Sequence, residues 1–370
     1  VGKALQVYHK FDRYRQGNRF EDVPGVEPPG YYDFTEVDSA QTNDWVKFKT
    51  VRNEVGIKGN LLKLFYNGYY AIRNYSMSYA YVDLSTAQIK TQGTESYLGG
   101  RVALRLDSIG EFSAWGELME TGNYRLEAQL VSRWLMASLK QMQYAPSFMQ
   151  QLYRGSHDTW NNNFSPVNVS QLGGHIMYNS SIFQVYPGVM FTRIGNYVFF
   201  KDDPNRVGQR VLPEQTSGDI LMAAPEVKVG ITMARHIHLR GRAIYTQLIT
   251  NTNSSVQVPE LFVNGELSYE NIFFNGNLDM HGGIDVHWKS AYNAMGYDVP
   301  TQQFYVQQSY QPPTFPIVDV FFSTRIKRAR ILFKYNNLMQ LITKQGYMPT
   351  PYYPGQRNVI DFGFEWSFYD

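Results

Sequence analysis

The chain has 370 residues, with 34 Lys and Arg against 32 Asp and Glu, for a formal net charge of +2. This balance excludes a basic nucleic-acid-binding domain and a long acidic tail. There is no cysteine, which excludes a disulfide framework and a thiol-ligated metal. Tyr and Phe are abundant, at 28 and 23 residues, and such aromatic side chains gather where membranes meet water.

The first predicted strand spans residues 4–15. Because the chain begins at Val1, without Met or a signal peptide, we expect a processed or truncated N-terminus. No stretch approaches the roughly 18 consecutive apolar residues of a transmembrane helix. A membrane location would therefore require a β-barrel.

Apolar and polar residues alternate with a period of two along most of the chain, which predicts β-strands. The alternation is clear in residues 98–107, 124–130, 278–288 and 331–336. The predicted strands have about 10–14 residues, longer than the roughly 5–6 of ordinary sheets. One short helical turn is predicted within residues 144–153.

Short and long connections alternate between these strands. Tight turns are predicted at Gly59-Asn60, Ile109-Gly110, Asn179-Ser180, Arg235-His236, Asn275-Gly276 and Lys327-Arg328, with two further hairpins near Gly122-Asn123 and Ser132-Arg133. Long connections are predicted at 16–44, 75–94, 144–166, 194–218, 291–315 and 343–357. This pattern predicts an all-β protein: a transmembrane antiparallel up-and-down β-barrel of about 16 strands, with 14 to 18 possible, forming a single domain over residues 1–370.

The last predicted strand, residues 358–369, reads NVIDFGFEWSFY. Four of its aromatic residues fall on one face, which we predict to be lipid-facing: Phe362, Phe364, Trp366 and Phe368. Asp361, Gly363 and Glu365 alternate with them, because successive side chains of a strand point to opposite faces. Such a strand is typical of the closing strand of an outer-membrane barrel.

Charged residues lie opposite the apolar positions of the predicted strands. Arg or Lys facing lipid at the bilayer midplane costs roughly 2–4 kcal/mol, so these side chains should point into the barrel. The predicted pore-lining residues are Arg101, Arg105, Asp107, Arg125, Glu127, Arg240, Arg242, Asp279, Asp285, Arg325, Lys334 and Glu365. They could form the selectivity field of an open pore or an ion-paired network that fills a closed lumen.

Other candidate sites are weaker, and we expect no metal, no cofactor and no catalytic residue. Asp279, His281, Asp285 and His287 share a strand face, but residues two apart on a strand lie about 7 Å apart, too far to chelate one ion directly. Acidic residues of the first long loop could hold Ca²⁺, although a solvated loop is the simpler interpretation. These acids are Glu21, Asp22, Glu27, Asp33, Glu36 and Asp38.

A hydrolytic site was also considered. Ser156, His157 and Asp158 are adjacent in a loop, with Asn161 nearby, but catalytic triads are assembled in space and adjacency is weak support. We therefore predict that the protein is not an enzyme.

Several segments resemble the putative porin family of Bacteroidota outer membranes. They are residues 259–308, FPIVDVFFSTRIKRARILFKYNNL at 315–338, the terminal YPGQRNVIDFGFEWSFYD, and the loop segment APSFMQQLYRG at 145–155. The resemblance implies an outer-membrane barrel with a porin role. Members of the family are usually longer than this chain.

The leading functional hypothesis is an outer-membrane porin that allows passive or weakly selective diffusion of small solutes. The alternative is a non-conducting barrel that serves as a structural subunit of a larger outer-membrane complex. A barrel enzyme and a soluble β-sandwich are weaker rivals. The expected partners are outer-membrane lipid and lipopolysaccharide, the barrel-assembly machinery and other envelope proteins, with no nucleic acid; the expected location is the cell outer membrane.

Overall fold

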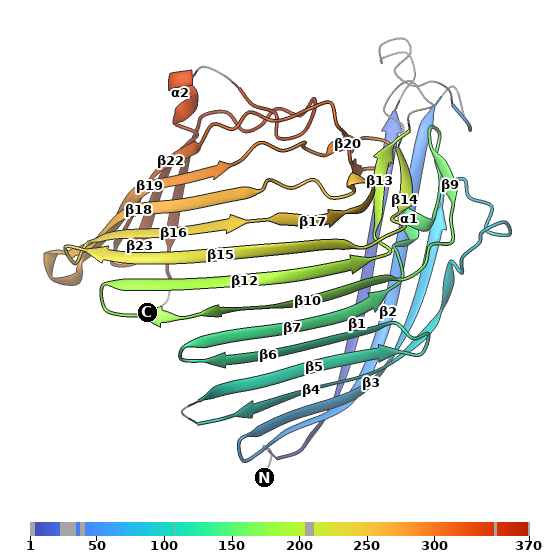
Figure 1. The fold of residues 1–370 in the computed structure, drawn as a ribbon, viewed down its shortest axis with the longest axis horizontal. Helices are drawn as coiled ribbons and strands as arrows, with labels where there is room; N and C mark the ends of the chain where they lie inside the picture. The colour runs from blue at the N-terminus through green and yellow to red at the C-terminus, as the bar shows by residue number, and fades with distance from the viewer. Residues whose placement is uncertain are drawn as a thin grey trace.

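The computed structural model of the chain describes residues 4–22, 35–37, 41–107, 109–203, 211–343 and 346–368. Strands dominate these residues, and the longer ones form a single curved sheet (Figure 1). Among the described residues, no helix is both long and apolar enough to cross a membrane.

The large sheet is built from strands that follow one another along the chain. They are β1 (Gln6–Asp22), β2 (Thr42–Leu61), β3 (Leu64–Tyr79), β4 (Gln92–Arg105), β5 (Gly110–Met119), β6 (Tyr124–Ser132), β7 (Leu135–Tyr144), β10 (Val167–Ile176), β11 (Tyr178–Asn179), β12 (Phe183–Gly195), β15 (Ile220–Met233), β16 (Ile237–Tyr245), β17 (Gln247–Asn251), β18 (Leu261–Phe273), β19 (Leu278–Lys289), β22 (Ile317–Ile326), β23 (Ala329–Asn336) and β24 (Val359–Trp366).

Each strand of this sheet is antiparallel to its neighbours, in an up-and-down order from β1 to β24. The sheet has 18 assigned strands, but β11 pairs with the same strand as β10, and β17 with the same strand as β16. The described residues therefore form sixteen successive crossings, as the sequence predicts. The prediction of a transmembrane up-and-down barrel fold is confirmed; within the described residues, β1 and β24 form the two edges of the wall.

Connections alternate as expected, although some boundaries differ. The first tight turn lies at Leu62-Lys63, and the predicted turn residues Gly59 and Asn60 belong to β2. A Cβ atom at Gly59 would lie 2.0 Å from the carbonyl oxygen of Ala4, so the glycine permits this close approach. β1 continues to Asp22, inside the predicted first loop.

Two further connections differ in whether local sequence signals predicted them. The predicted helix is a single turn, α1 (Phe148–Gln151), capped by Ser147 and Gln150 in a capping box. A long connection between β17 and β18, residues 252–260, has no counterpart in the sequence prediction. It contains the turn η1 (Thr252–Ser254), and the cluster of Asn, Thr and Ser at 251–255, followed by Pro259, was the loop signal that the prediction overlooked.

The two faces of the sheet differ in chemistry. The outer face carries exposed apolar side chains, such as Val55, Leu98, Leu172 and Phe191, which are 56%, 65%, 59% and 51% exposed. The inner face carries most of the strand charges and contacts the long loops. Exposed apolar surface on this scale is stable only against lipid or another apolar surface.

A loop layer packs on the inner face of β2 and β3 at the long-loop end. It contains α1 and short hairpins: β8 (Leu152–Arg154) with β9 (Thr159–Asn161), β13 (Val198–Asp202) with β14 (Val211–Gln215), and β20 (Gly296–Asp298) with β21 (Gln303–Tyr305). In Figure 1, α1, β13 and β14 lie beside the upper ends of β1 and β2. A second α-helix, α2 (Met339–Thr343), and the turn η2 (Phe274–Gly276) complete the described elements.

Aromatic side chains hold this loop layer together. Tyr153 and Trp160 have ring centroids 4.9 Å apart, and Trp160 lies 5.8 Å from Phe200. These three residues are buried in one cluster with Val46 and Met77 of the barrel wall. Burying a large apolar side chain contributes roughly 1.5–3 kcal/mol, so the loop layer is a packed part of the fold.

The alternation of connections sets the membrane orientation, since outer-membrane barrels place short turns in the periplasm and long loops outside. A cysteine at Asn277, in the tight turn after β18, should resist an impermeant maleimide in intact cells. A cysteine at Gln308, exposed in a long connection, should be labelled. Both should react after the membrane is permeabilised, and the reverse pattern in intact cells would contradict this orientation.

Candidate functional site: the charged inner face

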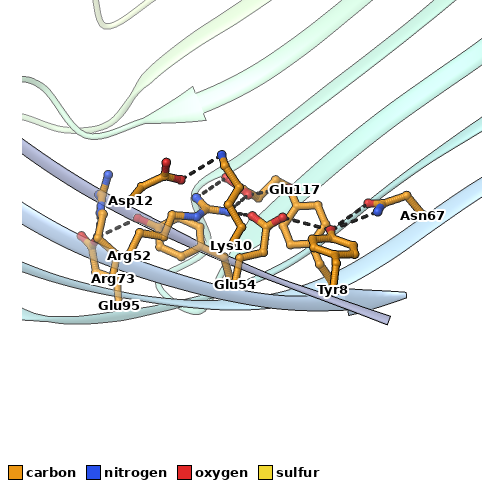
Figure 2. A network of polar contacts seen from close by, with 11 residues as sticks. Tyr8, Lys10, Asp12, Arg52, Glu54, Asn67, Arg73, Glu95 and Glu117 are labelled. Carbon is orange, nitrogen blue, oxygen red and sulfur yellow. Dashed lines mark hydrogen bonds and ion pairs between the residues drawn. The ribbon is translucent and has the colours of Figure 1, made fainter. Parts of the chain in front are cut away.

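The inner face of β1–β5 carries a connected network of charged and hydroxyl groups (Figure 2). Arg52 is its centre: the Nη2 atom lies 2.6 Å from Glu117 Oε2 and 3.1 Å from Glu54 Oε2. The Tyr69 hydroxyl donates a 2.7 Å hydrogen bond to Glu117, and the Tyr8 hydroxyl donates a 3.0 Å bond to Glu54. The strand register brings these residues together from four strands.

A second pair extends this network toward the loop layer. The Arg73 Nη2 atom lies 2.5 Å from Glu95 Oε2, which also accepts a 2.6 Å hydrogen bond from the Tyr97 hydroxyl. The Tyr97 ring lies between the two guanidinium groups, with its centroid 4.9 Å from the Arg52 and 5.2 Å from the Arg73 guanidinium carbon. Cation–π contacts of this kind become stronger when water is excluded.

The network is shielded from water, and its charges compensate one another. The side chains of Arg52, Glu54 and Glu117 are 21%, 12% and 18% exposed. A charge taken out of water is costly unless it is paired and hydrogen-bonded, and each carboxylate here has at least one cation and one hydroxyl donor. This part of the inner face is therefore nearly neutral despite its many charges.

A second network lies on β10, β15 and β16. Glu226 forms ion pairs with Arg242 at 2.5 Å and with Lys228 at 3.0 Å, and His175 Nε2 lies 3.2 Å from the same carboxylate. Farther along the wall, Lys334 lies 2.8 Å from Asp319 and 4.0 Å from Asp285. Opposite charges therefore meet across neighbouring strands all round the described wall.

The structure places the predicted pore-lining residues as follows. All except Asp107 lie on the inner face of strands. Most have a partner of opposite charge: Arg105 with Glu111, Arg125 with Glu127, Arg240 with Glu266 and Glu270, Arg242 with Glu226, Asp279 with Arg325, Asp285 with Lys334, and Glu365 with Arg330. Whether this face lines a pore stays a prediction.

Two residues of that set stand apart. Asp107 lies in the tight turn after β4, where it pairs with Lys63. Arg101 makes no ion pair with any residue that the structure describes, so it is an uncompensated positive charge of the inner face.

The four predicted lipid-facing aromatics of the C-terminal strand, Phe362, Phe364, Trp366 and Phe368, are exposed at 70%, 60%, 50% and 78%; their contact with lipid stays a prediction.

Sequence reasoning missed the best-formed network. Arg52, Glu54, Arg73, Glu95 and Glu117 are absent from the predicted set. In β2 the outer positions near the long-loop end include Lys47 and Lys49, so the alternation of polar and apolar residues is blurred. The available signal was the alternation of Arg52 and Glu54 with Val51, Val55 and Ile57.

A cavity of about 860 Å³ lies between this network and the loop layer. Its lining includes Arg73, Glu95 and Glu117 from the wall and Phe148 and Met149 from α1. Charged and aromatic groups thus line one cavity on the inner face.

The loop layer also buries polar groups. Ser156 is fully buried; its backbone N–H and its hydroxyl each donate a 2.8 Å hydrogen bond to Asp44. His157 Nε2 lies 3.4 Å from Thr42 Oγ1. These contacts anchor the loop to the start of β2, which is the simplest role for Ser156 and His157. In the acidic first loop, Glu27, Asp33 and Asp38 lie outside the described residues.

Asp298 is another buried acid of the loop layer. One of its oxygens accepts hydrogen bonds from the Thr301 backbone N–H and hydroxyl, while Oδ1 has no partner. Burial raises the pKa of Asp298 to about 6, although the hydrogen bonds from Thr301 oppose this shift. The side chain therefore favours the protonated form more than an exposed Asp does.

Comparison with known families gives one match over almost the whole chain. The model of a family described as putative porin matches residues 2–370. None of the curated proteins compared with the sequence matches it.

Solved structures resemble the fold at low sequence identity. The copper transporter OprC superposes with a TM-score of 0.61 at 11% identity, over 97% of this chain and 62% of that one. The siderophore receptor PirA from Acinetobacter baumannii gives 0.61 at 10% identity, over 98% and 60%. A ferric enterobactin receptor mutant from Pseudomonas aeruginosa gives 0.59 at 13%, over 90% and 54%. The chain thus spans little more than half the length of these proteins, and the likeness shows the fold alone.

Arg52→Gln tests the central network. The change removes the main cation of Glu54 and Glu117, whose carboxylates are shielded from solvent. We therefore expect a loss of about 2–3 kcal/mol in unfolding free energy. Urea unfolding of the folded protein in lipid vesicles measures this loss. Lys63→Gln breaks an exposed pair and should change stability little; equal effects of the two substitutions would show that the network does not stabilise the wall.

Asp298 should make the loop layer sensitive to pH. Because its pKa is higher in the folded than in the unfolded state, the native state holds the proton up to about pH 6. Its contribution is therefore fully present below about pH 4, is lost as the pH rises through 6, and is constant above that. Asp298→Asn keeps an acceptor for Thr301 and removes this dependence.

Hydrogen exchange of residues 296–306 between about pH 4 and 8 measures the effect, after correction for intrinsic exchange. Wild-type protection should fall from about pH 4 to about pH 6 and stay level above that, and Asp298→Asn protection should stay level throughout. Parallel profiles for the two proteins would contradict the assignment to Asp298.

Proposed function

The chain belongs to the putative porin family, and on this premise we propose that it forms the wall of a weakly selective channel for small hydrophilic solutes. It is an outer-membrane β-barrel protein, as the family and the structural neighbours together indicate. The diffusion role is the proposal. The observation that carries it is the charged inner face opposite an exposed apolar face.

Charge compensation supports weak rather than strong selectivity. Most inner-face cations have a carboxylate partner within 4 Å, so little net field remains to sort ions. Arg101 has no such partner among the described residues. The ion pair of Arg105 with Glu111 is long, at 3.7 Å, and the Arg105 side chain is 81% exposed, so this charge is weakly compensated. These two residues of β4 should give the channel a modest preference for anions.

The loop layer supports the alternative function. Its buried aromatic cluster covers part of the inner face at the long-loop end and would narrow a pore there. Exposed apolar side chains of the long connections, such as Phe304, Ile342 and Tyr352, could contact a partner protein. A non-conducting barrel within a larger outer-membrane complex is therefore the second candidate.

Planar-bilayer recording distinguishes these functions. We expect single-channel conductance, and a reversal potential in a salt gradient that shows slight anion preference. Arg101→Glu combined with Arg105→Glu should shift it toward cations, more at low than at high salt, because screening strengthens with ionic strength. Arg133→Glu with Arg235→Glu makes the same charge change in two tight turns and is the control.

Equal shifts in the two double variants would show that Arg101 and Arg105 do not face the conducting path. Absence of conductance at any voltage, with protein folded as judged by its altered migration in unboiled gels, would reject the channel. In that case the structural-subunit function would be favoured, and co-purification in mild detergent would identify the partner class.

A further inference from the structure

Two carboxylates and two imidazoles converge on the inner face near the tight-turn end of β16, β18 and β19. Glu266, Glu270 and His281 each bring one ligand atom within 4.8 Å of the others. His281 Nε2 lies 3.6 Å from Glu266 Oε1 and 3.6 Å from Glu270 Oε1. His238 Nε2 approaches the second oxygen of Glu270 at 3.9 Å.

These separations are those of ligands around one metal ion. Zinc bonds to nitrogen and carboxylate oxygen are about 2.0–2.1 Å, which places tetrahedral ligand atoms about 3.4 Å from one another. The two 3.6 Å separations from His281 are within a few tenths of an ångström of this spacing, and all three ligand atoms lie within 4.8 Å of one another. Two imidazoles with two carboxylates suit zinc and similar divalent transition metals.

The backbone explains why residues from different strands can meet here. Glu266 and Glu270 are four apart on β18, and the small side chain of Ser268 lies between them. Ser268 is opposite His238 of β16 on one side and Gly283 of β19 on the other. The site lies over the two small residues, Ser268 and Gly283. Sequence spacing on β19 alone, from Asp279 to His287, could not reveal this arrangement.

The surroundings hold the ligands in place. His281 Nε2 is shielded from solvent and makes no hydrogen bond, while its ring packs edge-on against Phe321 at 4.9 Å. Ser268 donates a 2.7 Å hydrogen bond to Glu266, and Thr232 Oγ1 lies 3.2 Å from His238 Nδ1, which leaves Nε2 facing Glu270. Such outer contacts are what orient metal ligands in proteins.

Arg240 provides the cation in the structure as it stands. Its guanidinium donates hydrogen bonds of 2.8 Å to Glu266 Oε1 and 2.7 Å to Glu270 Oε1, the same oxygens that face His281. The Arg240 side chain is 49% exposed, so it can move away without opening the barrel wall. We propose that Glu266, Glu270, His281 and His238 form a binding site for a divalent transition metal such as zinc, for which Arg240 is the competing internal cation.

The proposal is tested by calorimetric titration of tag-free folded protein in detergent with Zn²⁺. The wild type should bind one equivalent. Glu270→Gln and His281→Asn should each weaken binding at least tenfold, and Arg240→Gln should tighten it about tenfold by removing the competing cation. His175→Asn, which changes a histidine beside Glu226 outside the cluster, should leave the affinity unchanged.

Co²⁺ gives a second readout, because tetrahedral nitrogen and oxygen ligands produce strong visible absorption. The band should appear in the wild type and His175→Asn and disappear in His281→Asn. No bound equivalent in the wild type, binding by Arg240→Gln alone, or equal affinity in wild type and His281→Asn would each overturn the proposal. Channel conductance does not enter this test, so its result is separate from the proposed diffusion function.

Discussion

The backbone hydrogen-bond ladder between neighbouring antiparallel strands is the constraint on which the whole structure depends. In hydrocarbon there is no water to satisfy a free N–H or C=O group, so each strand needs a neighbour on both sides. The up-and-down order provides this for every strand between β1 and β24, with short turns at one end, where each strand pairs with the next in the chain. The requirement fixes strand direction and register, and register then decides which side chains face each other across the wall.

Register has its clearest consequence for charge. Side chains that are far apart in the sequence, such as Arg52 and Glu117, meet because four strands lie in fixed alignment. In a poorly hydrated interior an unpaired charge is expensive, and the pairing of cations and carboxylates lowers this cost. The same pairing weakens the net field of the inner face, so one physical effect both stabilises the wall and would limit ion selectivity in the proposed channel. Arg101 and Arg105 are where that compensation is weakest.

The loop layer is stabilised by different interactions from the wall. Its strands are short, and its cohesion comes from buried aromatic contacts and from hydrogen bonds that link separate connections. Val306 donates a 2.9 Å hydrogen bond to the Phe200 carbonyl, and the Gln150 side chain donates to the Val198 carbonyl at 3.2 Å. Burial raises the pKa of Asp298, so we expect this layer to depend on pH, whereas the wall depends on register and pairing.

The sequence by itself determined the class of fold, the approximate number of crossings and most of the alternation of short and long connections, because a period of two and local turn chemistry depend on neighbouring residues. It also placed Arg240, Asp285 and Glu365 on the face opposite the apolar residues. Only the tertiary structure decided which charges pair, because partners such as Arg73 and Glu95 are brought together by register between strands. The cluster of Glu266, Glu270 and His281 has the same origin: its ligands bend over Ser268 from two strands, and no spacing along one strand predicts that contact.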